Sequence, residues 1–167
     1  MSKIIDFYFD FISPYSYIAY KKIKSMQNKN GVDFNYKPIL LGGLHKLGNI
    51  TAPAFNERKM KNMMNDCEII ANKNNISFKW NEKFPINTLY LMRGFISIDA
   101  NKKSEYFDIC FDAYWKNNID ISIEANVNKI LDNCKIDKKK FFEVISNQKV
   151  KDKLKSLTEE AFQNDVF

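Results

Sequence analysis

Ser13 is the first residue whose type and position could do chemistry. It precedes Pro14 where a strand-like stretch runs directly into a helical one. Serine followed by proline is typical of a helix N-cap and a first helical residue. The N–H groups and positive dipole end of such a helix favour an anion, and a serine hydroxyl can donate a hydrogen bond to a thiolate. Ser13 therefore predicts either a site that stabilises a bound thiolate or a plain N-cap, which contributes about 1 kcal/mol without a ligand.

Other nucleophilic arrangements find little support in the sequence. Cys67, Cys110 and Cys134 are far apart and include no C-x-x-C pair, which argues against a disulfide scaffold and against a zinc cluster. We expect Cys67 and Cys110 to be small buried residues. The single histidine, His45, is flanked by glycines and is expected in a surface loop, so a Ser-His-acid triad is not predicted.

The charge pattern argues against partners such as nucleic acids and membranes. Of the 26 basic residues behind the net charge of +6, only Arg58 and Arg93 are arginine, and the lysines are scattered. Such a surplus is typical of a solvated surface. No apolar run reaches the roughly 18 residues of a membrane span, and no secretory signal opens the chain, so a cytoplasmic location is expected.

Three segments near the N-terminus are predicted to position Ser13. Ile4–Phe11 and Val32–Ile39 alternate with a period of two, which indicates strands, and a helix is predicted from Pro14 to about Lys29. A strand, helix and strand in one sheet form a right-handed parallel unit. The glycine-containing segment Leu40–Pro53 is predicted to be a loop.

Helical patterns dominate the rest of the chain. Apolar residues at spacings of three and four predict helices over Ala54–Asn75, Thr88–Asp99, Lys102–Trp115, Ser122–Cys134, Asp137–Ser146 and Gln148–Asn164. The fold class is therefore α/β. Residues 1–50 form its mixed N-terminal part, 51–147 an all-helical middle, and 148–167 a last helix; the resemblance described next implies that the middle is an insertion and that the last helix returns to the first part.

Several motifs resemble the kappa-class glutathione transferases and the 2-hydroxychromene-2-carboxylate isomerases. They include Asp10-Phe11 with Ser13-Pro-Tyr-Ser-Tyr-Ile-Ala, then Gly48-Asn49, Arg58-Lys59 and Asn65-Asp66. The segment from Phe84 to Gly94 is more similar to the isomerases. The resemblance covers essentially the whole chain and implies a thioredoxin-like domain interrupted by a helical one.

The resemblance also implies a cofactor and an activity. The serine that Ser13 matches stabilises the thiolate of glutathione, which adds reversibly to an unsaturated aromatic substrate so that a double bond can rotate. Asn49 and Lys59 match positions that contact glutathione, and Asp66 matches one supplied across a dimer interface. From the residues alone, Asn49 suits a turn, Lys59 an exposed helix face and Asp66 a solvated helix charge.

A substrate site for a small aromatic compound is expected around Asn87, Arg93 and Trp80. Arg93 could pair with a substrate carboxylate, or it could tie helices together. Asn87 could line the pocket or cap the following helix. Trp80 could form an apolar wall with Phe84, Met60 and Met64, although aromatic and methionine residues at helical spacing are usually core.

The resemblance further implies a homodimer and a longer chain. A second copy could cover apolar faces of the helical middle that include Phe107, Phe111, Tyr114 and Trp115. In the family, a Gly-x-Pro segment and further strands follow the position of Phe167, so the chain resembles a truncated version with weakened glutathione binding. The alternatives are a kappa-like transferase and a catalytically inactive fragment or interaction module. A thiol-disulfide oxidoreductase is not expected, because Ser13 and Ser16 occupy the cysteine positions.

Overall fold

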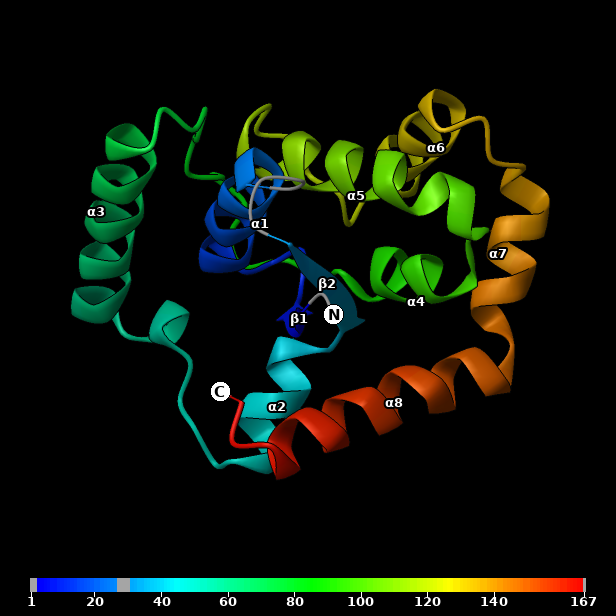
Figure 1. The fold of residues 1–167 in the computed structure, drawn as a ribbon, viewed down its shortest axis with the longest axis horizontal. Coiled ribbons are helices and arrows are strands. Elements are labelled where there is room, and N and C mark those ends of the chain that lie inside the picture. Colours follow the sequence, from blue (N-terminus) through cyan, green and yellow to red (C-terminus); the bar gives the residue numbers. More distant parts are fainter. Residues whose placement is uncertain (1–2, 27–30, 167) are drawn as a thin grey trace.

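The predicted parallel unit is present and carries the serine. The computed structural model describes residues 3–26 and 31–166, and in it β1 (Lys3–Phe9) pairs in parallel with β2 (Val32–Pro38). The helix α1 (Pro14–Met26) connects them (Figure 1). β1 ends at Phe9, two residues earlier than predicted, because the chain turns there. The predicted helix end near Lys29 lies outside the described residues.

The segment after β2 is not the predicted loop. It forms the helix α2 (Leu41–Leu47), whose Leu44 is buried against Ile39 and Ala161. Glycine suggested a loop, but at Gly43 it permits close packing, since a Cβ there would lie only 3.4 Å from Thr158 Cγ2. His45 is consequently half-buried in α2 rather than in a surface loop, and this burial lowers the pKa of its imidazole.

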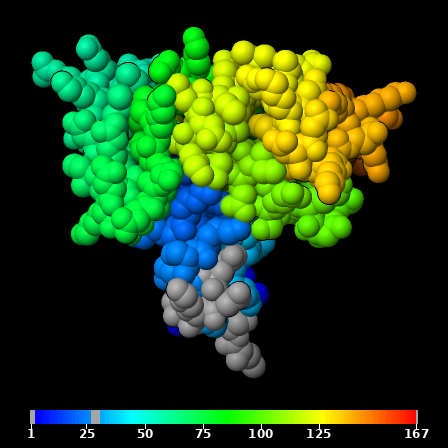
Figure 2. Space-filling view, turned by 90° about the horizontal axis from the view of Figure 1, so that it is seen from above, coloured from blue at the N-terminus to red at the C-terminus, as the bar shows by residue number. Residues whose placement is uncertain are grey.

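The remaining helices follow the predicted order. They are a short 3₁₀ turn η1 (Pro53–Phe55), α3 (Glu57–Lys73), α4 (Leu89–Ser97), α5 (Ala100–Trp115), α6 (Glu124–Asn133), α7 (Lys138–Ser146) and α8 (Gln148–Gln163). The predicted helix Ala54–Asn75 is divided, because the Asn56 side chain accepts the Lys59 N–H and caps α3. Figure 1 shows α3 at one end of the molecule and α7 at the other, with α8 running back toward α2. In Figure 2 the start of the chain projects from this array of helices.

A single aromatic core joins the N-terminal unit to the helices. The ring centroids of Phe9 and Tyr20 lie 4.3 and 4.2 Å from that of Phe107. Phe11 packs edge-on against Phe111 at 4.9 Å. The apolar faces expected to meet a second copy are therefore buried inside the chain, so the choice of these residues as a dimer surface is wrong, while the homodimer itself stays a prediction. Their members are at most 2% exposed, namely Phe107, Phe111, Tyr114 and Trp115.

The length and hydropathy of the helices also bear on membrane insertion. Within residues 3–26 and 31–166, no helix combines enough length with enough apolar character to cross a bilayer.

Candidate functional site

Ser13 closes a turn between β1 and α1. Its N–H donates to the Asp10 carbonyl at 2.9 Å, and its Oγ accepts the Ser16 N–H at 3.1 Å, so the predicted N-cap is confirmed. Pro14, the first helical residue, is buried, whereas Ser13 is half-buried. Because Oγ acts as an acceptor and no described residue accepts the hydroxyl hydrogen, that hydrogen remains available to a ligand at the positive end of α1.

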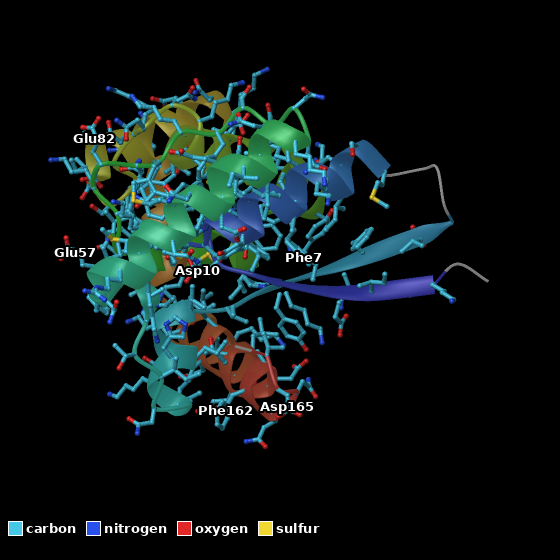
Figure 3. All side chains as sticks on the ribbon, turned by 90° about the vertical axis from the view of Figure 1, so that its left-hand side faces the viewer. Phe7, Asp10, Glu57, Glu82, Phe162 and Asp165 are labelled. Carbon is cyan, nitrogen blue, oxygen red and sulfur yellow. The ribbon has the colours of Figure 1, made fainter. Side chains whose placement is uncertain are left out.

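Distant helices hold the turn in place. The Trp115 indole N–H, from α5, donates to the Phe11 carbonyl at 2.9 Å. The Phe11 N–H donates to the Met92 sulfur of α4 at 3.5 Å. Asp10 lies at the inner end of the strand, farther inside than Phe7 (Figure 3), and is 3% exposed. Met92 and Trp115 were missed as supporting residues, since nothing local in the sequence connects them to the serine, and Asp10 was named only as part of the family motif.

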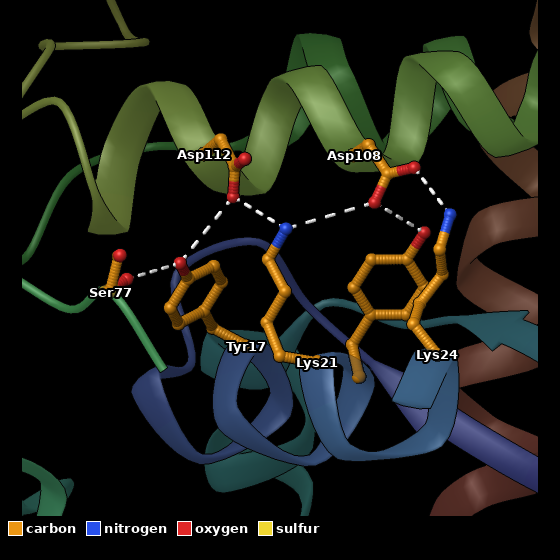
Figure 4. A network of polar contacts seen from close by, with 7 residues as sticks. Tyr17, Lys21, Lys24, Ser77, Asp108 and Asp112 are labelled. Carbon is orange, nitrogen blue, oxygen red and sulfur yellow. Dashed lines mark hydrogen bonds and ion pairs between the residues drawn. The ribbon is translucent and has the colours of Figure 1, made fainter. Parts of the chain in front are cut away.

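Polar contacts also fix the direction of α1. Asp112 of α5 pairs with Lys21 at 2.7 Å, and Asp108 pairs with Lys24 at 2.6 Å. The Tyr17 hydroxyl donates to the Ser77 carbonyl at 2.6 Å (Figure 4). The full network joins Tyr17, Tyr20, Lys21 and Lys24 of α1 to Ser77, Asp108 and Asp112. Burial and Asp108 raise the pKa of Tyr20, which therefore stays a neutral donor. α1 is thus anchored to α5 along its length.

Asp66 lies beside the head of α1. The Tyr15 hydroxyl, two residues after Ser13, donates to Asp66 Oδ2 at 2.9 Å. Partial burial first, and Asp66 second, raise the pKa of Tyr15, so the phenol keeps its proton. The structure therefore brings Asp66 and Ser13 to the same end of α1 within one chain. Tyr15 was missed by the sequence analysis, although it stands inside the motif of Ser13.

Asn49 and Lys59 stand at the surface without a direct contact to Ser13. Asn49 occupies the turn after α2 with a φ of 51°, a conformation that asparagine tolerates well. Lys59 lies in the first turn of α3, is exposed, and forms no ion pair with any described carboxylate. Asn49 thus occupies a turn and Lys59 an exposed helix face, as the residues alone suggested. Both side chains remain accessible to a ligand.

The residues expected at the substrate lie along the segment leading into α4. The Asn87 amide oxygen accepts the Leu89 N–H at 2.9 Å, whereas the N-cap of α4 is Thr88, whose side chain forms no capping hydrogen bond. The Arg93 guanidinium is half-buried, its Nε has no partner among the described residues, and burial lowers its pKa. Trp80 packs on Phe84 and Trp115 with ring centroids 4.9 and 5.5 Å apart, so it belongs mainly to the core.

No reactive thiol or metal-binding cluster lies within the part of the chain that the structure describes. Cys67, Cys110 and Cys134 are free and buried, as predicted for the first two. Burial raises the pKa of Cys67 to about 12 and that of Cys134 to about 11, so both are neutral thiols at physiological pH. Residues 3–26 and 31–166 contain no group of three or more His, Cys, Asp or Glu side chains arranged to hold a metal ion. Surface hollows of about 480 and 500 Å³ lie along other parts of α1 and α5 and do not include Ser13.

Comparison with known proteins identifies relatives over parts of the chain. It is 40% identical over 70 residues to a 2-hydroxychromene-2-carboxylate isomerase of Sphingobium xenophagum, which covers 41% of this chain and 36% of that protein. It is 41% identical over 65 residues to glutathione S-transferase kappa 1 of Caenorhabditis elegans, covering 38% of this chain and 29% of the relative. Both alignments thus span roughly a third of the relative's length.

The whole fold is also found in a solved structure. That of a 2-hydroxychromene-2-carboxylate isomerase superposes with a TM-score of 0.87 at 23% identity, over 98% of this chain and 81% of the other. The DSBA-like thioredoxin domain matches residues 4–167. These matches confirm the thioredoxin-like α/β fold that the serine motif implied. The chain therefore belongs to the family of DSBA-like thioredoxin domains.

Proposed function

We propose that this protein is a glutathione-dependent cis-trans isomerase of the 2-hydroxychromene-2-carboxylate type. The isomerase relative and the match in fold support the reaction class, and the kappa-class relative supports glutathione as the cofactor. Ser13 donates its hydroxyl hydrogen to the glutathione thiolate. One observation carries this assignment: the hydroxyl hydrogen of Ser13 has no acceptor in the described chain and lies at the N-terminus of α1.

The serine and the helix act together on the pKa of a bound thiol. A hydrogen bond to the sulfur and a positive dipole end both favour the thiolate over the thiol. The cysteines of this chain cannot serve as the thiolate nucleophile, because all three are buried and inaccessible to a ligand. Glutathione bound as a thiolate supplies a nucleophile that adds reversibly to a conjugated double bond.

Several polar groups of the described chain suit glutathione, which carries two carboxylates and one ammonium group. Lys59 provides an exposed cation for a carboxylate, and Asn49 provides an amide. Asp66 provides an anion for the ammonium group, oriented by Tyr15. Asn87 at the entrance to α4 and Arg93 within this helix bind the polar end of the aromatic substrate, and Trp80 contributes apolar surface.

The proposal includes a homodimer in which Asp66 lies near the boundary between subunits. Phe55 and Ile69, on η1 and on α3 with Asp66, are 76% and 66% exposed. Burying such apolar surface against a second copy is the commonest form of protein self-association. Light scattering at micromolar concentration is expected to give twice the chain mass, and a monomer would confine the role of Asp66 to its own chain.

A kappa-like transferase is the second candidate, favoured by the 41% identity to the nematode enzyme. Both activities use the same thiolate, so Ser13 does not distinguish them. The products do, because an isomerase returns glutathione unchanged whereas a transferase consumes it. Chromatography of a reaction with 2-hydroxychromene-2-carboxylate, followed by one with an electrophilic aromatic halide, separates the two.

Substituting Ser13 tests the assigned role directly. Ultraviolet absorbance of the thiolate, measured as a function of pH, gives the pKa of bound glutathione. We expect Ser13→Ala to raise this pKa by about one unit or more and to reduce turnover at least roughly tenfold. Ser13→Asp retains the helix cap without a neutral hydroxyl donor, so it should fold well and still lose activity.

The control for this experiment is Ser16→Ala. Ser16 lies one helical turn further on and meets Ser13 only through its backbone N–H, so this variant should keep the low thiol pKa. An unchanged pKa in Ser13→Ala would refute the role of Ser13. A protein that fails to bind glutathione in calorimetry would instead favour the interaction module.

A further inference from the structure

Asp10 forms a buried polar junction between three segments of the chain. Its Oδ1 accepts the Ile12 N–H at 3.1 Å and the Thr88 hydroxyl at 2.6 Å, and its Oδ2 accepts the Leu41 N–H at 2.9 Å. Asp10 and Thr88 are only 3% and 4% exposed. No described lysine or arginine pairs with this carboxyl group, so its polar partners in the described chain are these three donors.

The first contact shapes the turn that ends at Ser13. The Asp10 side chain binds the Ile12 N–H while the Asp10 carbonyl binds the Ser13 N–H, so both polar groups of one residue define the path between them. A shift of the carboxylate would move the turn as a whole. The position of the Ser13 oxygen therefore depends on where Asp10 is held.

The other two contacts reach segments that carry further site residues. Leu41 is the first residue of α2, whose C-terminal turn bears Asn49, and the α2 N-cap, Leu40, offers no capping side chain. Thr88 directly follows Asn87 at the entrance to α4. One carboxylate thus connects the serine turn to the segment of a proposed glutathione contact and to that of a proposed substrate contact.

Burying a carboxylate at this position costs free energy of desolvation, which an apolar side chain packed in the same place would not cost. Burial raises the pKa of Asp10, because the charged form loses its hydration. A buried polar group that satisfies all its partners fixes one arrangement, whereas an apolar group of similar size would allow neighbours to slide.

We propose that Asp10 is a positioning residue that holds Ser13, Asn49 and Asn87 in one fixed arrangement. The expected effect on catalysis rests on the proposed function. The relative positions of Ser13, Asn49 and Asn87 can be tested without glutathione. Asp10 touches neither substrate nor cofactor and acts through the backbone of the turn and through Leu41 and Thr88.

Two substitutions probe the junction. Asp10→Asn keeps one acceptor oxygen but directs an amide N–H toward the Leu41 N–H, so at least one of the three bonds is lost. Thr88→Val removes the hydroxyl donor at nearly constant volume, and Thr88→Ser restores it. Amide resonances in two-dimensional NMR report the positions of Ser13, Asn49 and Asn87 without any ligand.

We expect Asp10→Asn to move all three of these resonances together. With glutathione bound, it should raise the thiol pKa and reduce kcat roughly 10- to 100-fold, as small displacements of reacting groups do. Thr88→Val should cause a smaller effect in the same direction, and Thr88→Ser should restore the original values. Such rescue would not follow from a general loss of stability.

The matched control is Thr158→Val in α8. Thr158 is also buried, and its hydroxyl accepts the Leu40 N–H at 3.0 Å, one residue from the Asp10 contact. Its loss should perturb α2 and α8 while leaving the Ser13 resonance and the thiol pKa unchanged. If Asp10→Asn shifted only the amide resonances of residues adjacent to position 10 and left those of Asn49 and Asn87 in place, the inference would be overturned, whether or not glutathione binds. Absence of glutathione binding by the unsubstituted protein would overturn the proposed function, and the NMR comparison would still decide the role of Asp10.

Discussion

Two hydroxyl groups at the head of α1 use their hydrogen-bonding capacity differently. Ser13 accepts a backbone N–H through its oxygen, whereas Tyr15 donates its hydrogen to Asp66. The first arrangement leaves a donor for a sulfur atom. The second fixes a carboxylate that would otherwise sample several rotamers on the surface of α3. Affinity for glutathione should therefore depend on Tyr15 even where Tyr15 makes no contact with the ligand.

Tyr15→Phe tests this dependence. The substitution removes the donor to Asp66 and preserves the ring, so we expect glutathione to bind about 2- to 10-fold more weakly, the loss typical of one hydrogen bond. Isothermal titration measures the change. Tyr90→Phe is the control, because Tyr90 is 44% exposed against 45% for Tyr15 and its hydroxyl forms no hydrogen bond to a carboxylate of the described residues. Equal affinities in the two variants would show that Asp66 needs no orientation by Tyr15.

At the scale of elements, the approach of α4 to its neighbours is set by one glycine. A Cβ at Gly94 would lie 2.5 Å from both Phe141 Cε2 and the Tyr106 hydroxyl oxygen. The Tyr106 hydroxyl also donates to the Leu91 carbonyl at 3.0 Å, so it cannot move aside freely. α4 carries Arg93 and follows Asn87, which makes this close contact relevant to the substrate side of the site.

Gly94→Ala should consequently destabilise the fold. Overpacking of a filled core costs about 1–3 kcal/mol, to be measured as a lower free energy of unfolding in urea. Gly42→Ala in α2 is the matched control, since a Cβ there meets nothing within 4 Å. It should stabilise the protein by about 0.4–1 kcal/mol, as replacing glycine in a helix usually does. Equal effects of the two substitutions would contradict the packing at α4.

A charged bridge attaches α8 to the sheet. Lys37 of β2 pairs with Asp6 of β1 at 2.8 Å and with Glu160 of α8 at 2.6 Å. The hydrogen bond to Lys37 is the first cause that lowers the pKa of both carboxyls below their ordinary values of 3.8 and 4.5. A lowered pKa contributes stability above the ordinary value, and that contribution disappears as the pH falls through the folded value.

Acid should therefore loosen α8 through this bridge. The protection of the α8 amides against hydrogen exchange, corrected for the intrinsic exchange rate at each pH, is expected to fall relative to that of the α5 amides between about pH 5 and about pH 3. Lys37→Met removes the bridge. In this variant the difference in amide protection between α8 and α5 should be nearly independent of pH over this range. A persistent acid effect in Lys37→Met would assign it to other carboxyls.

At the scale of the whole molecule, the N-terminal unit and the helical middle are not separated by an interface that could open. Phe9 and Phe11 of the first unit lie in the same cluster as Phe107 and Phe111 of α5. The division of the chain into domains at residues 50 and 147 stays a prediction, but the shared core implies that these parts unfold together.

Thermal unfolding should accordingly show one cooperative transition. Circular dichroism in the far ultraviolet reports helices, and in the near ultraviolet it reports the aromatic core. The two melting curves are expected to coincide. Two separated transitions would instead support independent units divided near residue 50.

The elements were largely predictable because their signals are local. The spacings of three and four from α3 to α8 reflect which helix faces are buried, and the structure confirms these helices. The period of two also predicted β1 correctly, although Lys3–Asp6 are exposed whichever way their side chains point. α2 was missed because Gly42 and Gly43 resemble a loop, and only the later helix α8 explains the small residue at Gly43. Phe107 and Trp115 were assigned to a dimer surface because hydrophobic spacing indicates that a helix has an apolar face, but not which part of the molecule covers that face.

The candidate site was predictable only where a motif names it. The N-cap at Ser13 follows from serine and proline alone, and the structure confirms it. The contacts that hold Ser13 come from Thr88 and Trp115, which are separated from it by most of the helical middle. Their partners are main-chain atoms or a carboxylate, so no complementary pattern in the sequence points to them.

The bond from Trp115 to Phe11 spans 104 residues and has a consequence for synthesis of the chain. On the ribosome, β1 and α1 emerge first, but the Phe11 carbonyl gains its buried donor only after α5 has left the exit tunnel. Ser13 therefore acquires its final geometry late, in the same step that closes the aromatic core. A nascent chain therefore cannot present the finished turn at Ser13, the proposed thiolate site, before α5 has joined the fold.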